Sequence, residues 1–219
     1  MSQTIQFVLA SQSPRRKELL QRLGISFQVI TSATDERVSS SDPAMVTSVL
    51  ANRKAMAVAE GLLCQGGTLW MRQPLIEQGT FRIGPADKAS VIGADTVVVI
   101  DGQIIGKPGS VVEARKMMHL LQGRTHEVYT GVAILTLQDG HQDRGRTFHD
   151  KTIVHVGELD EIELEEYITS PEPYDKAGGY GIQGEFAKYI TGIEGDYYNV
   201  VGLPINKLYQ ELKKLGIRL

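Results

Sequence analysis

The chain has 219 residues, a net charge of -3 and a pI near 6.0, which argues against a protein that binds nucleic acid or membrane surfaces. Its composition, 42% hydrophobic and 22% charged, is that of a soluble globular protein. Cys64 is the only cysteine, which excludes an intrachain disulfide and a thiolate zinc cluster. Residues 1–16 lack the features of a signal peptide, and no stretch approaches a membrane span. We therefore expect a cytoplasmic protein.

The first elements alternate between strand and helix. A strand is expected at 6–10, and a helix follows, with Ser13 as its N-cap, Pro14 at its first position and Gly24 at its end. A second strand is expected at 27–31.

A long helix is expected from Asp42-Pro43 to about Glu60, closed by Gly61. Residues 62–90 show no clean hydrophobic period and contain several glycines and prolines. They predict a surface insertion that is long enough to have a role of its own.

The remaining chain is expected to contain hairpins and shorter helices. Strands are expected at 91–100 and 103–105, joined by a tight turn at Asp101-Gly102, and at 126–137 and 147–156, joined by a turn at Asp139-Gly140. A further strand is expected near 186–191. Helices are expected at 111–122, at 161–169, where Asp160 and Glu163 would form a capping box, and at 204–215. This order predicts a single α/β domain over 1–219 with a mixed sheet in two lobes.

The segment LASQSPRRKELL is the first chemical signal. A strand that turns into a helix presents free N–H groups, and these bind anions. Arg15 and Arg16 lie in the first helical turn, where cations oppose the helix dipole unless an anion is bound. The alternative is a solvated helix start with two surface arginines.

The segment VIGADTVVVI is the second signal, because Asp95 interrupts a strand that should be buried. Gly93 and Ala94 leave room for another group to approach. Asp95 is therefore a candidate metal ligand or general base. The alternative is an Asp at a strand end that meets solvent or caps a turn.

Two lysines could neutralise phosphate charge. Lys54 interrupts an apolar helical stripe formed by Val46, Leu50 and Val58, although a lone lysine there more often extends its ammonium to solvent. Lys107 follows the 91–105 hairpin, which would return it toward the level of Asp95 if the turn is tight.

The segment YDKAGGYGIQG is the fourth signal. Three glycines within 177–181 suit a backbone that closely approaches a ligand, and Gln183 offers an amide that can read a base edge. Asp175 and Lys176 add charge. The alternative is a flexible loop.

Other sites are less informative. The five histidines lack zinc-ligand spacing, and neither a P-loop nor a nucleophile elbow is present.

Together these segments resemble the Maf family of nucleotide pyrophosphatases, relatives of the inosine triphosphate pyrophosphatases. The matching stretches are LASQSPRRKELL, TDE at 34–36, ANRKA at 51–55, GADTVVV at 93–99, GKP at 106–108, YDKAGGYGIQG at 174–184 and YYNVVGLP at 197–204. The resemblance implies a strongly twisted mixed sheet flanked by helices, with a central cleft between two lobes. It also implies hydrolysis of a nucleoside triphosphate between its α- and β-phosphates with Mg²⁺ or Mn²⁺.

The resemblance also implies roles for individual residues. Asp95 would accept the proton of the attacking water, and Glu36 would be a second acidic residue at the catalytic and metal site. Lys54 and Lys107 would join Arg15 and Arg16 in a phosphate clamp. The substrate-binding set would be Ser11, Arg15, Arg16, Thr96, Asp175, Lys176 and Gln183.

Arg15, Thr96 and Gln183 match the branch of the family that acts on dTTP and UTP rather than on methylated GTP. The chain departs from the family pattern in its long 62–90 stretch. This departure puts the choice of substrate in doubt more than the hydrolysis itself. A homodimer is expected by resemblance only.

Two other functions stay open. One is a non-catalytic nucleotide-binding regulator of cell division or septum formation, and the weaker one is a nucleotidyl transferase. Glu36 and Asp95 beside basic residues favour the hydrolase, because a pure binder needs no carboxylate to activate water.

Overall fold

One mixed sheet organises the described part of this computed structural model, which covers residues 5–31, 33–64 and 88–219. Its strands are β1 (Ile5–Leu9), β2 (Phe27–Val29), β3 (Lys88–Ile100), β4 (Gln103–Ile105), β5 (Thr125–Gln138), β6 (His141–Val156) and β7 (Ile190–Glu194). They lie in the order β2-β1-β3-β5-β6-β7, and β4 also pairs with β3. β1 runs parallel to β2 and β3, whereas the other pairs are antiparallel.

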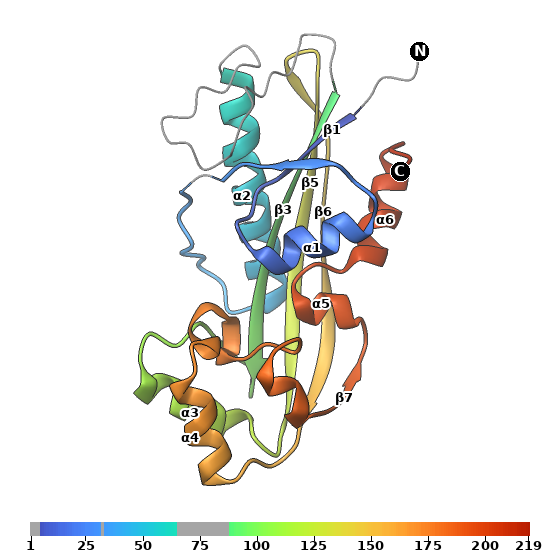
Figure 1. The fold of residues 1–219 in the computed structure, drawn as a ribbon. Coiled ribbons are helices and arrows are strands. Elements are labelled where there is room, and N and C mark those ends of the chain that lie inside the picture. Colours follow the sequence, from blue (N-terminus) through green and yellow to red (C-terminus); the bar gives the residue numbers. More distant parts are fainter. Residues whose placement is uncertain (1–4, 32, 65–87) are drawn as a thin grey trace.

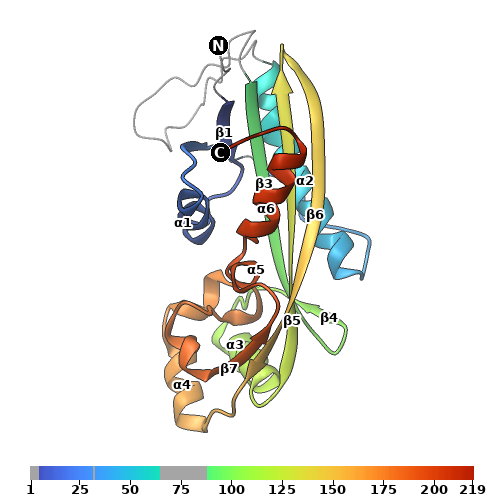
Figure 2. The same cartoon turned by 90° about the vertical axis from the view of Figure 1, so that its right-hand side faces the viewer.

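Helices cover both faces of this sheet (Figures 1 and 2). The helices are α1 (Pro14–Arg22), α2 (Pro43–Cys64), α3 (Val111–Leu121), α4 (Glu161–Thr169), α5 (Tyr197–Val201) and α6 (Ile205–Lys214). Side chains of a strand alternate between faces. On β3, Val91 therefore packs in the core beneath α2, while Ile92 and Ala94 pack in the core beneath α1 and α6.

A third core lies at the other end of the long strands, where α3 and α4 pack together (Figure 1). It contains Val98 of β3 and an aromatic group formed by Tyr167, Tyr180, Phe186 and Tyr189. The strands β3, β5 and β6 run through both halves. The expected α/β fold, a mixed sheet flanked by helices in two lobes, is therefore confirmed.

The region expected to be an insertion begins and ends differently from the prediction. The helix does not close at Gly61, because α2 continues to Cys64. Leu62 is fully buried against the sheet, and this packing offsets the roughly 1 kcal/mol that glycine costs inside a helix. Residues 88–90 belong to β3, and 65–87 lie outside the described residues.

The strand expected near 186–191 is only partly correct. Residues Glu185–Tyr189 form a 3-10 helix, and the strand β7 begins only at Ile190. Phe186 and Tyr189 are three residues apart and pack together with ring centroids 5.4 Å apart. That spacing places both rings on one side of a 3-10 turn, whereas a strand would direct them to opposite faces. The short helix α5 was not predicted.

Local signals for turns and caps are confirmed. Asp160 and Glu163 form the reciprocal capping box at the start of α4. The tight turns at Asp101-Gly102 and Asp139-Gly140 have positive φ at both positions, as a type I′ hairpin turn requires. Among the helices that the structure describes, none has the length and apolar character needed to cross a membrane.

Candidate functional site

A cleft of about 940 Å³ opens between the two lobes. The N-terminal end of α1, the middle of α2 and β3 contribute one wall, and β4 with the 175–183 segment contributes the other. Every residue that the sequence assigned to the site lines this one cleft: Ser11, Arg15, Arg16, Glu36, Lys54, Asp95, Thr96, Lys107, Asp175, Lys176 and Gln183. The structure therefore brings together groups from distant parts of the chain.

An ammonium group joins the two acidic residues. Lys54 Nζ lies 2.6 Å from Asp95 Oδ1 and 3.2 Å from Glu36 Oε1. Lys54 and Asp95 are largely buried, with side chains 19% and 13% exposed, whereas Glu36 is 70% exposed. Lys54 thus does not extend to solvent, and Asp95 is a largely buried, paired carboxylate rather than a cap at a strand end.

Two glycines allow α2 to approach the sheet this closely. A Cβ on Gly93 would lie 2.9 Å from the backbone nitrogen of Ala55, and closer still to the carbonyl oxygen of Ala51. A Cβ on Gly131, which pairs with Asp95, would meet the backbone of Thr47. The space left by the missing side chain of Gly93 is thus filled by α2, the helix that carries Lys54.

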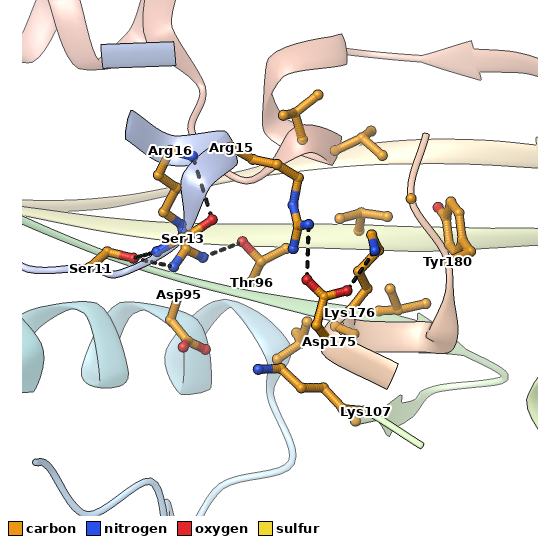
Figure 3. A pocket seen from close by; sticks show the side chains of 18 of the residues that line it. Ser11, Ser13, Arg15, Arg16, Asp95, Thr96, Lys107, Asp175, Lys176 and Tyr180 are labelled. Atoms are coloured by element: carbon orange, nitrogen blue, oxygen red, sulfur yellow. Dashed lines mark hydrogen bonds and ion pairs between the residues drawn. The ribbon is translucent and has the colours of Figure 1, made fainter. Parts of the chain in front are cut away.

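The first turn of α1 contributes two arginines with different surroundings (Figure 3). Arg16 donates hydrogen bonds to Ser11 Oγ at 3.2 Å, Thr96 Oγ1 at 2.9 Å and the carbonyl of Gly202 at 2.8 Å. These neutral acceptors fix the guanidinium without cancelling its charge. Burial lowers the pKa of Arg16, while the nearby charge of Asp95 raises it; an arginine side chain nevertheless stays protonated in proteins.

Arg15 reaches the opposite wall of the cleft. Its Nη1 lies 3.3 Å from Asp175 Oδ2, and Asp175 also accepts a hydrogen bond from Lys176 (Figure 3). Partial burial acts to raise the pKa of Asp175, but the hydrogen bond and charge of Lys176, together with Arg15, outweigh it and lower the pKa. The two lobes are thus linked by an ion pair at the mouth of the site.

The glycine-rich segment is shaped by packing against the protein itself. Gly178 has φ of +72°, and a Cβ there would lie 2.8 Å from a methyl group of Val98. Its N–H donates to the carbonyl of Gly106 at 2.9 Å, which fastens the segment next to Lys107. Gln183 and Lys107 are exposed in the cleft.

Beyond the charged groups the cleft has an apolar part. Its lining there includes Val98, Ile105, Val128, Ile182 and Tyr180. The cleft therefore combines a region for a polyanion with a region for a flat, partly apolar group, in the size range of small-molecule sites.

Asp95 and Glu36 are residues of the cleft that could hold a divalent cation such as Mg²⁺. Mg²⁺ uses one or two carboxylates and completes its shell with substrate phosphates and water. Asp95 and Glu36 supply two such groups, both within ion-pair distance of one ammonium. Within residues 5–31, 33–64 and 88–219, no three His, Cys, Asp or Glu side chains form a cage of their own.

One residue that supports this site from beneath the cleft carries no sequence signal. Thr130 lies directly opposite Thr96 in the β3–β5 ladder, is fully buried, and has its hydroxyl 3.0 Å from that of Thr96. A lone threonine in an apolar strand fits the core equally well, so only the pairing of the strands places it here.

Known proteins resemble this chain over nearly its whole length. The profile of the family described as "Maf-like protein" matches residues 6–215. A protein of Agathobacter rectalis named "dTTP/UTP pyrophosphatase" is 45% identical over 212 residues, covering 97% of this chain and 98% of its own. A protein of the same name from Bacillus cytotoxicus is 43% identical and covers 95% and 94%.

The solved structure of the Staphylococcus aureus Ham1 protein covers 96% of this chain and 99% of its own, at 12% identity and a TM-score of 0.43. The sequence matches, in contrast, are close and nearly complete. The chain belongs to the Maf-like protein family.

Proposed function

We propose that this protein hydrolyses dTTP and UTP to the nucleoside monophosphate and pyrophosphate. The observation that carries the proposal is the cleft in which Lys54 joins Asp95 and Glu36 beside Arg15 and Arg16. The relatives named dTTP/UTP pyrophosphatase support the choice of substrate.

Charge determines how a nucleotide would lie. A triphosphate carries about four negative charges, which must be offset before water can attack phosphorus. Arg15 and Arg16 of α1, Lys54 of α2 and Lys107 after β4 line the cleft and carry positive charges. The triphosphate would therefore lie along these groups, and the base would occupy the apolar part near Tyr180.

The carboxylate of Asp95 is the group we assign to the attacking water. It would orient the water and take its proton. The water oxygen would then bond to the α-phosphorus, while the bond from that phosphorus to the oxygen bridging the α- and β-phosphates breaks. The hydrogen bond from Lys54 at 2.6 Å holds this carboxylate in place. The arginines would stabilise the negative charge that builds on the departing pyrophosphate.

Asp95 and Glu36 would hold Mg²⁺ or Mn²⁺, which when bound supplies further positive charge against the phosphate oxygens. We expect EDTA to abolish pyrophosphate release and added Mg²⁺ or Mn²⁺ to restore it. Turnover that persists after complete removal of metal would contradict this part of the proposal.

The decisive experiment measures pyrophosphate release from a panel of nucleoside triphosphates. We expect dTTP and UTP to be preferred, and Asp95→Asn to lower kcat at least about 100-fold, as for a lost general base. Asp139→Asn is a matched control, because Asp139 lies in an exposed hairpin turn that asparagine also suits. Nucleotide binding without any release would indicate the regulator instead, and near-normal turnover by Asp95→Asn would refute the assigned base.

The same proposal includes a cytoplasmic location and a homodimer. The single cysteine and the net charge of -3 support a reducing compartment and no role in binding nucleic acid. Light scattering after gel filtration would give the mass of the protein in solution, and a mass of one chain would rule out the dimer.

A further inference from the structure

The guanidinium of Arg16 belongs to a closed ring of hydrogen bonds and backbone. Its Nη2 donates to Thr96 Oγ1 at 2.9 Å, and Thr96 lies 3.0 Å from Thr130 Oγ1. Thr130 donates to the carbonyl of Asn199 at 2.8 Å. The ring closes through α5 and Gly202, whose carbonyl accepts from Arg16 Nε at 2.8 Å. It thus joins α1, β3, β5 and the end of α5.

The direction of each hydrogen bond in this ring is determined. A threonine hydroxyl has one proton, and that of Thr130 is used on the carbonyl of Asn199. Thr96 must therefore donate to Thr130. Its lone pairs are then turned toward Arg16, whose guanidinium can only donate.

Asn199 anchors this end of the ring to the sheet. Its side chain is fully buried, and Nδ2 donates to the carbonyl of Val128 on β5 and to Thr152 Oγ1 on β6, both at 3.0 Å. The hydroxyl of Thr152 in turn donates to the carbonyl of Asp196, the N-cap of α5. The short helix α5 is therefore held in place on two strands.

We propose that Thr130 is a positioning residue which, with Asn199, orients Thr96 and so holds Arg16 in the geometry that stabilises the triphosphate. This inference rests on the proposed function for what Arg16 does, although the ring itself is independent of it. Thr130 contributes to the reaction without touching the nucleotide, and its side chain is 0% exposed.

The first test removes only the hydroxyl. Thr130→Val keeps the shape of the side chain and should lower kcat/KM for UTP about tenfold, the size expected for one hydrogen bond to a charged network. Thr130→Ser keeps the hydroxyl and should restore activity to within about threefold of the unchanged protein. Thr47→Val is the matched control, because that buried hydroxyl bonds only within α2.

The second test asks whether Thr130 acts through Thr96. We expect Thr96→Val combined with Thr130→Val to be no slower than Thr96→Val alone, because both remove the same link. Losses that multiply would show that Thr130 acts by another route and would overturn the proposal.

A third measurement does not depend on turnover. The Arg16 Nε–H should exchange with solvent faster in Thr130→Val than in Thr47→Val, as seen by NMR of protein labelled with ¹⁵N-arginine. Unchanged exchange would refute the relay even if activity falls. If the unchanged protein releases no pyrophosphate, the proposed function fails while this exchange still decides the relay. Should Thr130→Val not fold, Thr130→Ala and the less buried Thr96→Val test the same link.

Discussion

Gly131→Ala should disturb the site by moving a helix rather than by touching the chemistry. The added Cβ would lie 2.6 Å from the backbone nitrogen of Ser48 and closer to the carbonyl group of Thr47. Ordinary contact begins near 3.4 Å, so the closest of these atoms requires α2 to retreat by about 1 Å. Backbone atoms cannot swing aside as a flexible side chain does.

Two consequences follow from this displacement. Overpacking of a well-packed core costs about 1–3 kcal/mol, which for a chain of this size lowers Tm by about 3–10 °C. The retreat of α2 would also move Lys54 away from Asp95. In the unchanged protein Lys54 Nζ lies 2.6 Å from Asp95 Oδ1. Because a misplacement of 1 Å can cost about 100-fold and the lysine can partly re-extend, we expect kcat to fall about tenfold.

Thermal unfolding followed by circular dichroism and steady-state release of pyrophosphate from UTP measure these effects. Gly192→Ala is the matched control, because its Cβ on β7 would meet only a ring carbon of His155 at 3.7 Å. We expect its Tm to stay within about 2 °C. A Gly131→Ala protein as stable and active as this control would refute the claim that close packing of α2 sets the position of Lys54.

Two further predictions concern other parts of the molecule. Arg15→Ala should raise KM for UTP and dTTP about tenfold, because the loss of one charge-assisted contact weakens the hold on the phosphates; steady-state kinetics would check this, and unchanged constants would contradict a phosphate contact. His126 is buried against Tyr180, and burial, with a smaller effect of His155, lowers its pKa to about 4. Since the unfolded chain binds that proton near pH 6.5, stability should be full above pH 6.5 and fall by about 3 kcal/mol as pH drops to 4. Urea unfolding between pH 7 and 4.5 should show this slope, and His126→Gln should flatten it; equal slopes would contradict it.

Much of the local structure was predictable because it depends on residues a few positions apart. The helix start at Ser13, the capping box of Asp160 and Glu163, and the turn at Asp139-Gly140 are all interactions within one turn of chain. The start of the strand expected near 186–191 was predicted wrongly, because it depends on contacts with residues outside that stretch. Phe186 packs against Tyr167 and Tyr180, outside that stretch, as well as against Tyr189, and these ring contacts suit a 3-10 helix rather than a strand.

The residue types at the candidate site were also visible in the sequence, through signals such as a carboxylate in an apolar strand and arginines at a helix start. Their partners were not. Lys54 and Asp95 are 41 positions apart, and Arg15 and Asp175 are 160 apart. No sequence pattern indicated that Lys54 would be paired rather than solvated.

The sequence by itself determined the caps, the turns and the strand that carries Asp95. It also indicated which charged residues belong to the candidate site. Only the tertiary structure decided which charges meet, that Gly93 and Gly131 admit a helix rather than a ligand, and that Thr130 lies opposite Thr96. The reason is physical: caps and turns depend on neighbouring peptide groups, whereas strand register and helix docking are fixed by the packing of the whole core.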